Sequence, residues 1–279
     1  MPTVCLLCSI FTLESAEASK NKYISMFNFW ISSLITSKSL NKNDKLVIIL
    51  DQKTADFLLG CTIFNSLIKL LPCTSGLTII PSPKTFEEGC MYRYYVNFEY
   101  EQDILMYTDI DIQFLQSLKI VLAKMKPNFI YLHAEGLLKD SNYGTYLSEI
   151  ERKLLFSKIE NLPGYNSGKF AFWGKDYHKM IFSLLWQQQE DIEKEMLPKA
   201  YCYDQCLFNR AVYTCCLLYG FKIDSSVFEQ HCTNFNGYQN STDLSDIVII
   251  DCCGEPGKED LHFTKIQYVH LQFLHFRLN

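Results

Sequence analysis

The sequence predicts an α/β fold, in which a mostly parallel central sheet is flanked by helices. Three observations lead to this prediction. Short apolar runs alternate with longer amphipathic stretches, 48% of the 279 residues are hydrophobic, and no internal repeat or long linker divides the chain. Strands of a buried parallel sheet read as continuous apolar runs, and alternating strands and helices cover such a sheet on both faces. We therefore expect one domain over residues 1–279.

Apolar runs and helical periodicity place the expected elements along the chain. The expected strands include Thr3–Phe11, Lys45–Leu50, Leu77–Ile80, Ile104–Tyr107 and Asn128–Leu132. The expected helices include Lys20–Ser39, Ala55–Leu71, a helix that begins at Gly89 and runs to Val96, and Gln205–Tyr219.

Charge and hydropathy exclude several classes of partner. A net charge of −5 argues against a protein that binds the phosphates of a nucleic acid, since such a protein normally has a basic face. The most apolar stretches, such as Leu46–Leu50 and Ile247–Ile250, are far shorter than the ~20 residues of a membrane-spanning helix. Met1–Phe11 lacks the basic start of a signal peptide. We expect a cytoplasmic protein without a membrane span.

The chain has 12 cysteines, and we expect them to be free. Many lie inside apolar runs, where a thiol behaves as a small buried hydrophobic group in a reducing compartment. Cys5 and Cys8 have the spacing of half a zinc site. In a strand, however, residues three apart point to opposite faces, so this pair does not converge on one metal ion.

Polar residues that follow apolar strands are the candidates for function, because open α/β sheets bind ligands beyond the carboxyl ends of their strands. The first candidate is Asp109 with Asp111, directly after the strand Ile104–Tyr107. Carboxylates two apart on an extended segment face the same side and can share one hard cation. The alternative is that the pair caps a following helix, Ile112–Met125.

Two further segments have the same character. In Leu162–Trp173 a polar cluster leads into an aromatic strand, and Gly168 permits close approach of the backbone to a ligand. In Asp246–Lys258 an apolar strand ends at Asp251, followed by a glycine-bearing turn and a lysine that suit a phosphate. The alternative for the last segment is a tight turn with a solvated lysine.

In their order along the chain, these segments resemble the motifs of the GT-A glycosyltransferases. The resemblance is strongest to the retaining glycogenin-like families and related ones, which include small cytosolic enzymes of large DNA viruses. It rests on Ile10–Thr12 with Tyr23, Leu46–Asp51, Gly89–Tyr94, Met106–Asp111, Tyr165–Gly168, Tyr203–Asn209 and Asp251–Lys258. It implies a single Rossmann-like GT-A domain. Residues 1–111 are then the nucleotide-binding half, and residues 112–279 the acceptor half with the C-terminal metal and diphosphate turn.

The resemblance also implies a metal site that holds Mn²⁺ or Mg²⁺. Asp109 and Asp111 match the acidic pair of the family. The third ligand of the family is usually a histidine before the C-terminal glycine turn, and Asp251 stands at that place. A carboxylate there suits the oxygen-preferring cations Mg²⁺ and Mn²⁺, although it departs from the family pattern.

The remaining roles follow from the same resemblance. Donor-binding side chains are expected at Thr12, Tyr23, Arg93, Asp109, Asn166, Ser167, Gly254 and Lys258. Gly254 and Lys258 match the diphosphate turn, and Asp204 and Gln205 match the residues that line the reaction centre. Simpler structural roles are the alternatives. In these alternatives, Arg93 stacks on its neighbouring tyrosines, Tyr23 belongs to the core and Asp204 is a helix N-cap. His133 is then a rim residue and not a contact to the acceptor.

The function implied is transfer of a sugar from a nucleoside-diphosphate donor, a UDP-sugar by family default, to an unknown glycan, protein or small molecule. Retention at the anomeric carbon is the family's outcome. A haloacid dehalogenase-like phosphatase with Asp109 as nucleophile competes, although that family's acidic pair lies near the start of its domain. A third reading is a non-catalytic GT-A-like domain that binds a nucleotide or a partner. For a viral enzyme, the expected location is the host cytoplasm or the virus factory.

Overall fold

The computed structural model describes residues 1–148, 150, 161–174, 176–195, 200, 202–240 and 243–253. The strands are β1 (Val4–Ile10), β2 (Lys45–Asp51), β3 (Thr74–Ile80), β4 (Ile104–Thr108), β5 (Ile112–Phe114), β6 (Phe129–Leu137), β7 (Pro163–Trp173), β8 (Ile223–Asp224), β9 (Cys232–Asn234) and β10 (Ile249–Asp251). The α-helices are α1 (Tyr23–Thr36), α2 (Gln52–Leu59), α3 (Thr62–Leu70), α4 (Phe86–Met91), α5 (Lys119–Leu122), α6 (Ser141–Gly144), α8 (Tyr177–Lys194), α9 (Tyr203–Tyr219), α10 (Ser226–His231) and α11 (Phe235–Asn240). Two 3-10 helices are η1 (Ala18–Lys20) and η2 (Tyr92–Tyr94).

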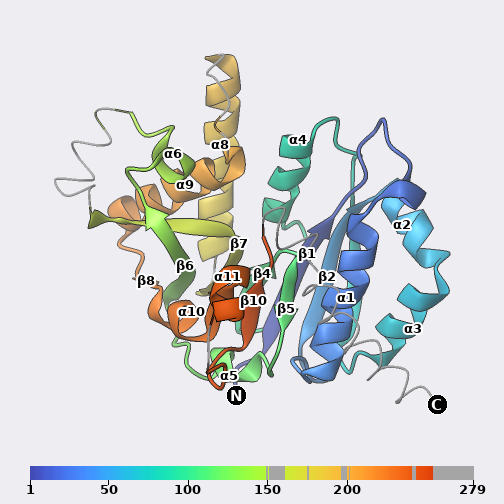
Figure 1. The fold of residues 1–279 in the computed structure, drawn as a ribbon. Coiled ribbons are helices and arrows are strands. Elements are labelled where there is room, and N and C mark those ends of the chain that lie inside the picture. Colours follow the sequence, from blue (N-terminus) through green and yellow to red (C-terminus); the bar gives the residue numbers. More distant parts are fainter. Residues whose placement is uncertain are drawn as a thin grey trace.

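A seven-stranded sheet in the order β3-β2-β1-β4-β7-β6-β8 forms the centre of the fold (Figure 1). Strands β3, β2, β1 and β4 are parallel, and β7 is antiparallel to both of its neighbours. A second sheet of three strands has the order β5-β10-β9. The predicted α/β class with a mostly parallel sheet is confirmed.

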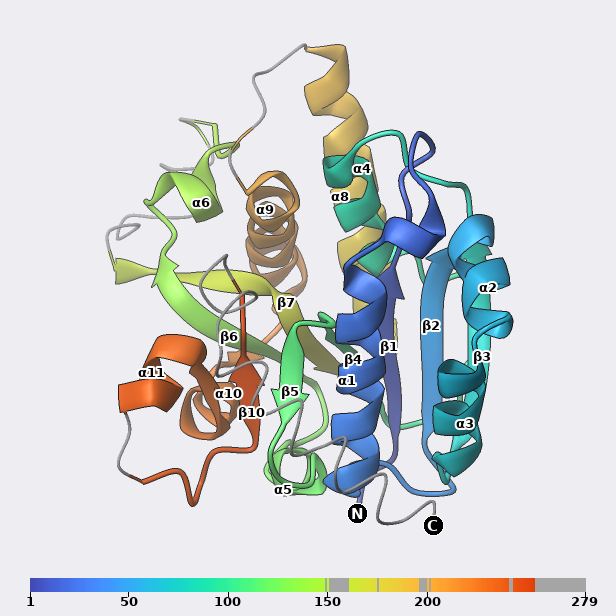
Figure 2. The same cartoon turned by 45° about the vertical axis from the view of Figure 1, so that its right-hand side comes forward.

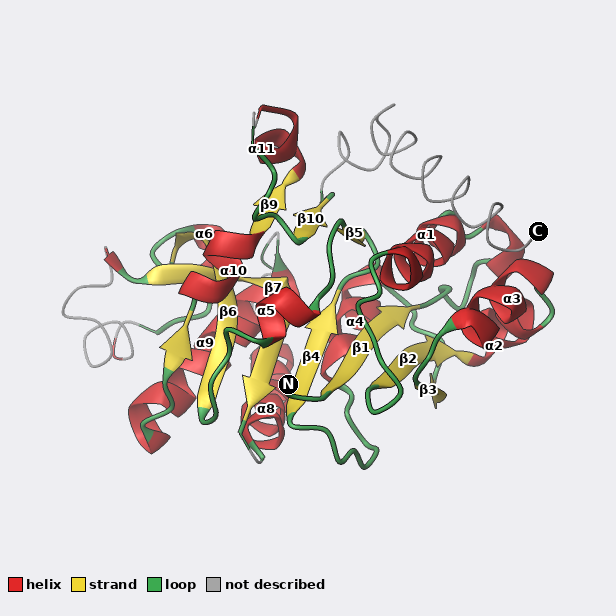
Figure 3. Ribbon diagram, turned by 90° about the horizontal axis from the view of Figure 1, so that it is seen from below, coloured by secondary structure: helices red, strands yellow, loops and turns green. Residues whose placement is uncertain are grey.

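Helices cover both faces of the central sheet, as Figures 2 and 3 show. Helices α1 to α3 pack with one set of alternate strand residues, and α8 and α9 pack with the other set. Cys5 and Cys8 illustrate this alternation, since they belong to the cores on opposite faces of β1. All twelve cysteines are free thiols, as expected. In the described part of the chain, no helix has the length and apolarity needed to cross a membrane.

The first half follows the sequence prediction with two differences: one helix is divided, and the helix expected from Gly89 to Val96 begins at Phe86 and continues as the 3-10 helix η2 at Tyr92–Tyr94. The predicted helix Ala55–Leu71 is two helices, α2 and α3, because the chain leaves the helical conformation at Cys61. Asp51, at the end of β2, caps α2 by accepting a hydrogen bond from the backbone N–H of Thr54. Thr85 caps α4 in the same way through Glu88.

Three local predictions around the acidic pair and β7 are wrong. The alternative helix Ile112–Met125 does not begin after the acidic pair: Ile112 and Phe114 are buried in β5, which pairs with β10, and only Lys119–Leu122 of this range forms an α-helix, α5. The polar cluster Asn166–Gly168 is not a loop before a strand but lies inside the 11-residue strand β7. Asp204 is not an N-cap, because Cys202 holds that position and Asp204 lies in the first turn of α9. For β5 and β7, pairing with a distant strand overrides the local signal.

Candidate active site

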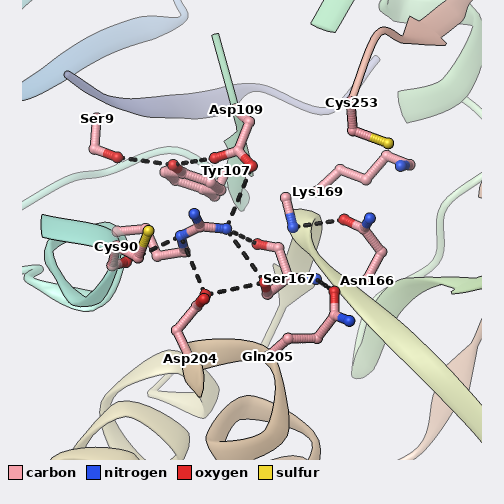
Figure 4. Close-up of polar contacts among 12 residues, drawn as sticks. Ser9, Cys90, Tyr107, Asp109, Asn166, Ser167, Lys169, Asp204, Gln205 and Cys253 are labelled. Carbon is pink, nitrogen blue, oxygen red and sulfur yellow. Dashed lines mark hydrogen bonds and ion pairs between the residues drawn. The ribbon is translucent and has the colours of Figure 1, made fainter. Parts of the chain in front are cut away.

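The acidic pair lies where the parallel strand β4 ends. The side chain of Asp109 accepts a hydrogen bond from the Tyr107 hydroxyl at 2.6 Å, and that hydroxyl also lies 2.8 Å from the Ser9 hydroxyl (Figure 4). The backbone N–H of Asp109 donates to Gly168 O at 2.7 Å. Asp111 follows two residues later and is buried. Strands β1, β4 and β7 together therefore position the pair.

Arg93 is the centre of the charge network at this edge. Its Nη1 donates to Asp109 Oδ2 at 3.3 Å and to the backbone oxygen of Ser167 at 3.0 Å. Its Nε lies 3.5 Å from Asp204 Oδ2. The guanidinium carbon also lies 5.4 Å from the centre of the Tyr107 ring. Arg93 thus pairs with Asp109 as predicted, and the ring that it faces is that of Tyr107 rather than one of its neighbours in the sequence.

Asp204 and Gln205 reach the same place from α9 (Figure 4). Asp204 Oδ2 accepts hydrogen bonds from the hydroxyls of Ser167 at 3.0 Å and Tyr94 at 3.2 Å. Gln205 Oε1 accepts from the backbone N–H of Ser167 at 3.2 Å. The structure therefore brings Arg93, Asp109, Ser167, Asp204 and Gln205 together.

Gly168 makes the close approach between β7 and the acidic pair possible. A Cβ atom at this position would lie 2.6 Å from Asp109 Oδ2 and 2.9 Å from Asn166 Oδ1. Asn166 Oδ1 in turn accepts from the backbone N–H of Gly168 at 2.5 Å. Any larger residue would push the Asp109 carboxylate away, so glycine is required by packing at this point.

A second charge cluster lies next to this one along β7. Lys169 Nζ donates to Asp251 Oδ2, at the end of β10, and to Glu135 Oε1 of β6 at 3.1 Å. Glu135 also accepts from Asn166 Nδ2 at 2.7 Å and lies 3.0 Å from His133 Nδ1. The Lys169 side chain is 0% exposed. Figure 4 shows Lys169 close to Asn166 and Ser167.

Burial and charge set the ionisation of these groups in opposite directions. Burial and the neighbouring Asp111 raise the pKa of Asp109 to about 7, although the Arg93 guanidinium opposes this. Burial also disfavours the charged form of Glu135, but hydrogen bonds from His133 and the charge of Lys169 outweigh it and lower its pKa to about 2. Asp251 and Glu135 outweigh the desolvation of Lys169 and hold its pKa above its usual value. Lys169 and Glu135 are therefore a charged pair at neutral pH.

An aromatic cleft opens beside the acidic pair. Arg93, Asp109 and Asp111 form part of its lining. Its aromatic part consists of Phe11, Tyr23 and Phe86, and the Tyr23 and Phe86 rings are stacked with their centres 6.5 Å apart. Tyr23 thus lines the cleft as the donor-binding prediction requires, although it also packs against the core.

Of the remaining predicted donor residues, one is buried outside the cleft lining and two cannot be placed because they lie outside the described residues. Thr12 is 2% exposed, and its backbone N–H and hydroxyl bond to Asp51 and Thr54, so it supports the end of β2 and is not part of the cleft lining. Gly254 and Lys258, the predicted diphosphate turn, lie outside the described residues.

The predicted three-carboxylate metal site is not assembled. No group of three metal-ligating side chains occurs among the described residues. Asp109 and Asp111 stand together, but Asp251 is 2% exposed and turned to Lys169. The carboxylate oxygens of Asp109 and Asp111 suit Mg²⁺ or Mn²⁺. The arrangement thus fits a cation held by two protein carboxylates more closely than one held by three.

Sequence reasoning missed Lys169, Glu135, Phe86 and Tyr107. Lys169 had a usable signal, because it is the one charged residue in the otherwise apolar run Lys169–Trp173. A lysine is almost never fully buried unless it is paired. Phe86 had no such signal, because its place beside Tyr23 depends on how α4 packs near α1.

A mixed, mostly parallel sheet with polar side chains gathered beyond the carboxyl ends of its strands is the arrangement of ligand-binding α/β domains. Among solved structures, the chain is similar to the apo structure of the WbbM bifunctional glycosyltransferase, with a TM-score of 0.57 and 12% sequence identity. The match covers 96% of this chain and 52% of that chain, so this protein spans about half its length. The likeness shows a glycosyltransferase-like α/β fold. No protein-family model matches the chain, and no curated protein matches it.

Proposed function

We propose that the protein is a glycosyltransferase that moves a sugar from a nucleoside-diphosphate donor, with a UDP-sugar favoured, to a glycan, protein or small-molecule acceptor. The observation that carries the proposal is the Arg93 network. It joins η2, the acidic pair, β7 and α9 beside an aromatic cleft, in a glycosyltransferase-like fold. A site for a nucleotide sugar needs an aromatic surface for the base, positive charge for the diphosphate and polar groups for the sugar.

The aromatic end of the cleft suits a nucleotide base. The Tyr23 and Phe86 rings, whose centres lie 6.5 Å apart at an interplanar angle of 30°, both line the cleft and offer an aromatic surface on which a flat base can stack. Stacking of a base on an aromatic side chain contributes about 1–3 kcal/mol. Uracil and guanine both stack, so the base itself is left to measurement.

Arg93 is placed for the diphosphate. Its Nε and Nη1 are used by Cys90, Asp109 and Ser167, whereas its Nη2 makes no hydrogen bond to the described residues. Arg93 also lines the cleft. A guanidinium that is held in place by protein acceptors, and that has one nitrogen left to donate hydrogen bonds, is suited to bind a phosphate oxygen.

Mn²⁺ or Mg²⁺ at Asp109 and Asp111 is part of the proposal, and a bound divalent cation would neutralise charge on the departing nucleoside diphosphate. Arg93 would stabilise the same charge from its fixed position. Breaking the anomeric bond also gives the sugar oxocarbenium character. The Asp204 carboxylate, oriented by Tyr94 and Ser167, would stabilise that positive charge. Gln205 and Asn166 would bind sugar hydroxyls, and we propose retention, as the sequence resemblance implies.

The test is calorimetric titration of UDP, GDP and their sugars into the wild type and Asp111→Asn, with and without Mn²⁺. We expect one nucleotide to bind with an affinity that Mn²⁺ increases in the wild type and not in the variant. Asp243→Asn, at an exposed position, is the matched control and should bind as the wild type does. Absence of binding by every nucleotide under both conditions would contradict the proposal. Binding without release of UDP from any UDP-sugar would favour the non-catalytic alternative.

A further inference from the structure

Lys169 occupies a cation site built from two carboxylates. Asp251 Oδ2 and Glu135 Oε1 come from different strands, β10 and β6, and both accept hydrogen bonds from Lys169 Nζ. The lysine side chain is 0% exposed. Two carboxylates that converge on one buried point form the kind of site that a divalent metal ion occupies in other proteins. Here the charge belongs to the chain itself.

Both carboxylate oxygens of Asp251 already accept hydrogen bonds within the protein. Its Oδ2 is bound by Lys169, and its Oδ1 accepts from the backbone N–H of Cys253 at 3.0 Å. The backbone next to Asp251 nevertheless lies beside the acidic pair, since the N–H of Cys252 donates a hydrogen bond to the backbone oxygen of Asp111 at 3.0 Å. Asp251 therefore lies in the right neighbourhood for a third metal ligand but is held by the lysine.

We propose that Lys169 is a resident cation that withholds Asp251 from the metal site. Of the described residues, Asp109 and Asp111 then bind a divalent ion, together with the phosphates of the donor. This inference rests on the proposed function for its donor and metal, and it makes Lys169 a positioning residue that acts through Asp251. The ligand-free protein should accordingly bind Mn²⁺ weakly, because two protein carboxylates leave most of the coordination shell to water and nucleotide.

The physical reason is the high energy of separating the pair. If Asp251 turned to a metal ion, Lys169 would lose one of its two counter-charges in a place from which water is excluded. Breaking a buried ion pair in this way is strongly unfavourable. Conversely, Lys169→Met keeps most of the side-chain volume and removes the charge. It leaves the buried carboxylate of Asp251 and the partly exposed carboxylate of Glu135 directed at one point, which a divalent cation can neutralise.

The first experiment compares the wild type with Lys169→Met by thermal unfolding and by Mn²⁺ titration, without nucleotide. We expect the melting temperature of the variant to fall in EDTA and to recover in Mn²⁺, and its Mn²⁺ affinity to exceed that of the wild type by at least about tenfold, the scale on which groups around a metal change its binding. The double variant Lys169→Met/Asp251→Asn is the control and should show no such recovery. A folded Lys169→Met protein that gains neither stability nor affinity from Mn²⁺ would overturn the proposal.

The second experiment needs no loss of the lysine, so it decides the question if Lys169→Met does not fold. In Asp251→Asn, Lys169 keeps Glu135 as its partner. We expect Mn²⁺ affinity in the presence of UDP to stay within about threefold of the wild type, whereas Asp111→Asn should weaken it by at least about tenfold. An equal loss in the two variants would show that Asp251 is a metal ligand.

These experiments also distinguish failure of the proposed function from failure of the proposed role of Lys169. If the wild type binds no nucleotide, the proposed glycosyl transfer fails. The Mn²⁺-dependent stability of Lys169→Met, measured without nucleotide, still tests the role of Lys169.

Discussion

Two buried cationic side chains lie side by side at β7: Arg93 of η2 contacts Ser167 of that strand, and Lys169 belongs to it. Each is held by two carboxylates. Arg93 contacts Asp109 and Asp204, and Lys169 contacts Asp251 and Glu135. The side chain of Arg93 is 10% exposed and lines the cleft, whereas that of Lys169 is 0% exposed. The charges are alike, but only the arginine is open to a ligand. Access, not charge, thus distinguishes a binding group from a positioning group here.

The largest expected effect comes from breaking the arginine cluster. Arg93→Met leaves Asp109 and Asp204 without their counter-charge, and removal of one partner of a buried pair costs about 3–5 kcal/mol in the free energy of unfolding. Nucleotide affinity should fall by at least about 100-fold, because a charged hydrogen bond to phosphate is lost. Urea unfolding and calorimetry measure the two effects. Arg210→Met is the control, because Arg210 is on α9 and is not part of the cleft lining. If Arg93→Met bound nucleotide as tightly as the wild type, Arg93 would not be the binding group of the pair.

The lysine cluster should respond differently, with stability as its main readout. In EDTA, Lys169→Met alone should lower the free energy of unfolding by about 3–5 kcal/mol, since Asp251 stays charged and buried without its counter-charge. Adding Asp251→Asn should restore at least about half of this loss, because a buried pair removed as a whole is often nearly neutral. Urea unfolding of the four proteins of this double-mutant cycle gives the coupling energy. Additive single effects would mean that the two side chains are not coupled.

Acid should weaken the lysine cluster through Glu135. Its pKa is lowered to about 2 from the ordinary 4.5, so its contribution is fully present above about pH 4.5 and is lost as the pH falls toward 2. The contribution is at most about 3 kcal/mol, and Glu135→Gln should flatten this part of the stability curve. Buried His178, whose pKa is lowered to about 4 by desolvation, titrates in both proteins and cancels in the difference. An unchanged slope between pH 2 and 4.5 (the window set by these pKa values) would contradict the assignment.

The smallest effect is expected at the glycine between the two clusters. Gly168→Ala places a Cβ atom 2.6 Å from Asp109 Oδ2, so the carboxylate must move. We expect Mn²⁺ and nucleotide affinity to fall about tenfold, and the free energy of unfolding to fall by about 1–2 kcal/mol through overpacking. Gly76→Ala on β3 is the control, because its Cβ meets nothing within 4 Å. If the two substitutions had equal effects, the contact between residue 168 and the Asp109 carboxylate would not be the cause of the loss.

The sequence alone determined the α/β class and most of the elements of the first half. Strands β1, β2 and β4 are buried along nearly their whole length, so they appear in the sequence as unbroken apolar runs. The acidic pair was predictable because it follows one of these runs directly. The resemblance identified four further site residues: Arg93, Ser167, Asp204 and Gln205. In the structure, Ser167 and Asp204 contact the Arg93 guanidinium, and Gln205 contacts Ser167.

Only the tertiary structure decided the partner of each charged group. Asp251 was predicted as a metal ligand from its place along the chain, but Lys169, 82 residues away, takes it as an ion-pair partner. Likewise, the Asn166–Gly168 cluster lies within a strand because β6 pairs with β7 both before the cluster, at Tyr165, and after it, at Phe170. Local patterns report burial and periodicity. They carry no information on which distant side chains meet, because that depends on the order and direction of the strands.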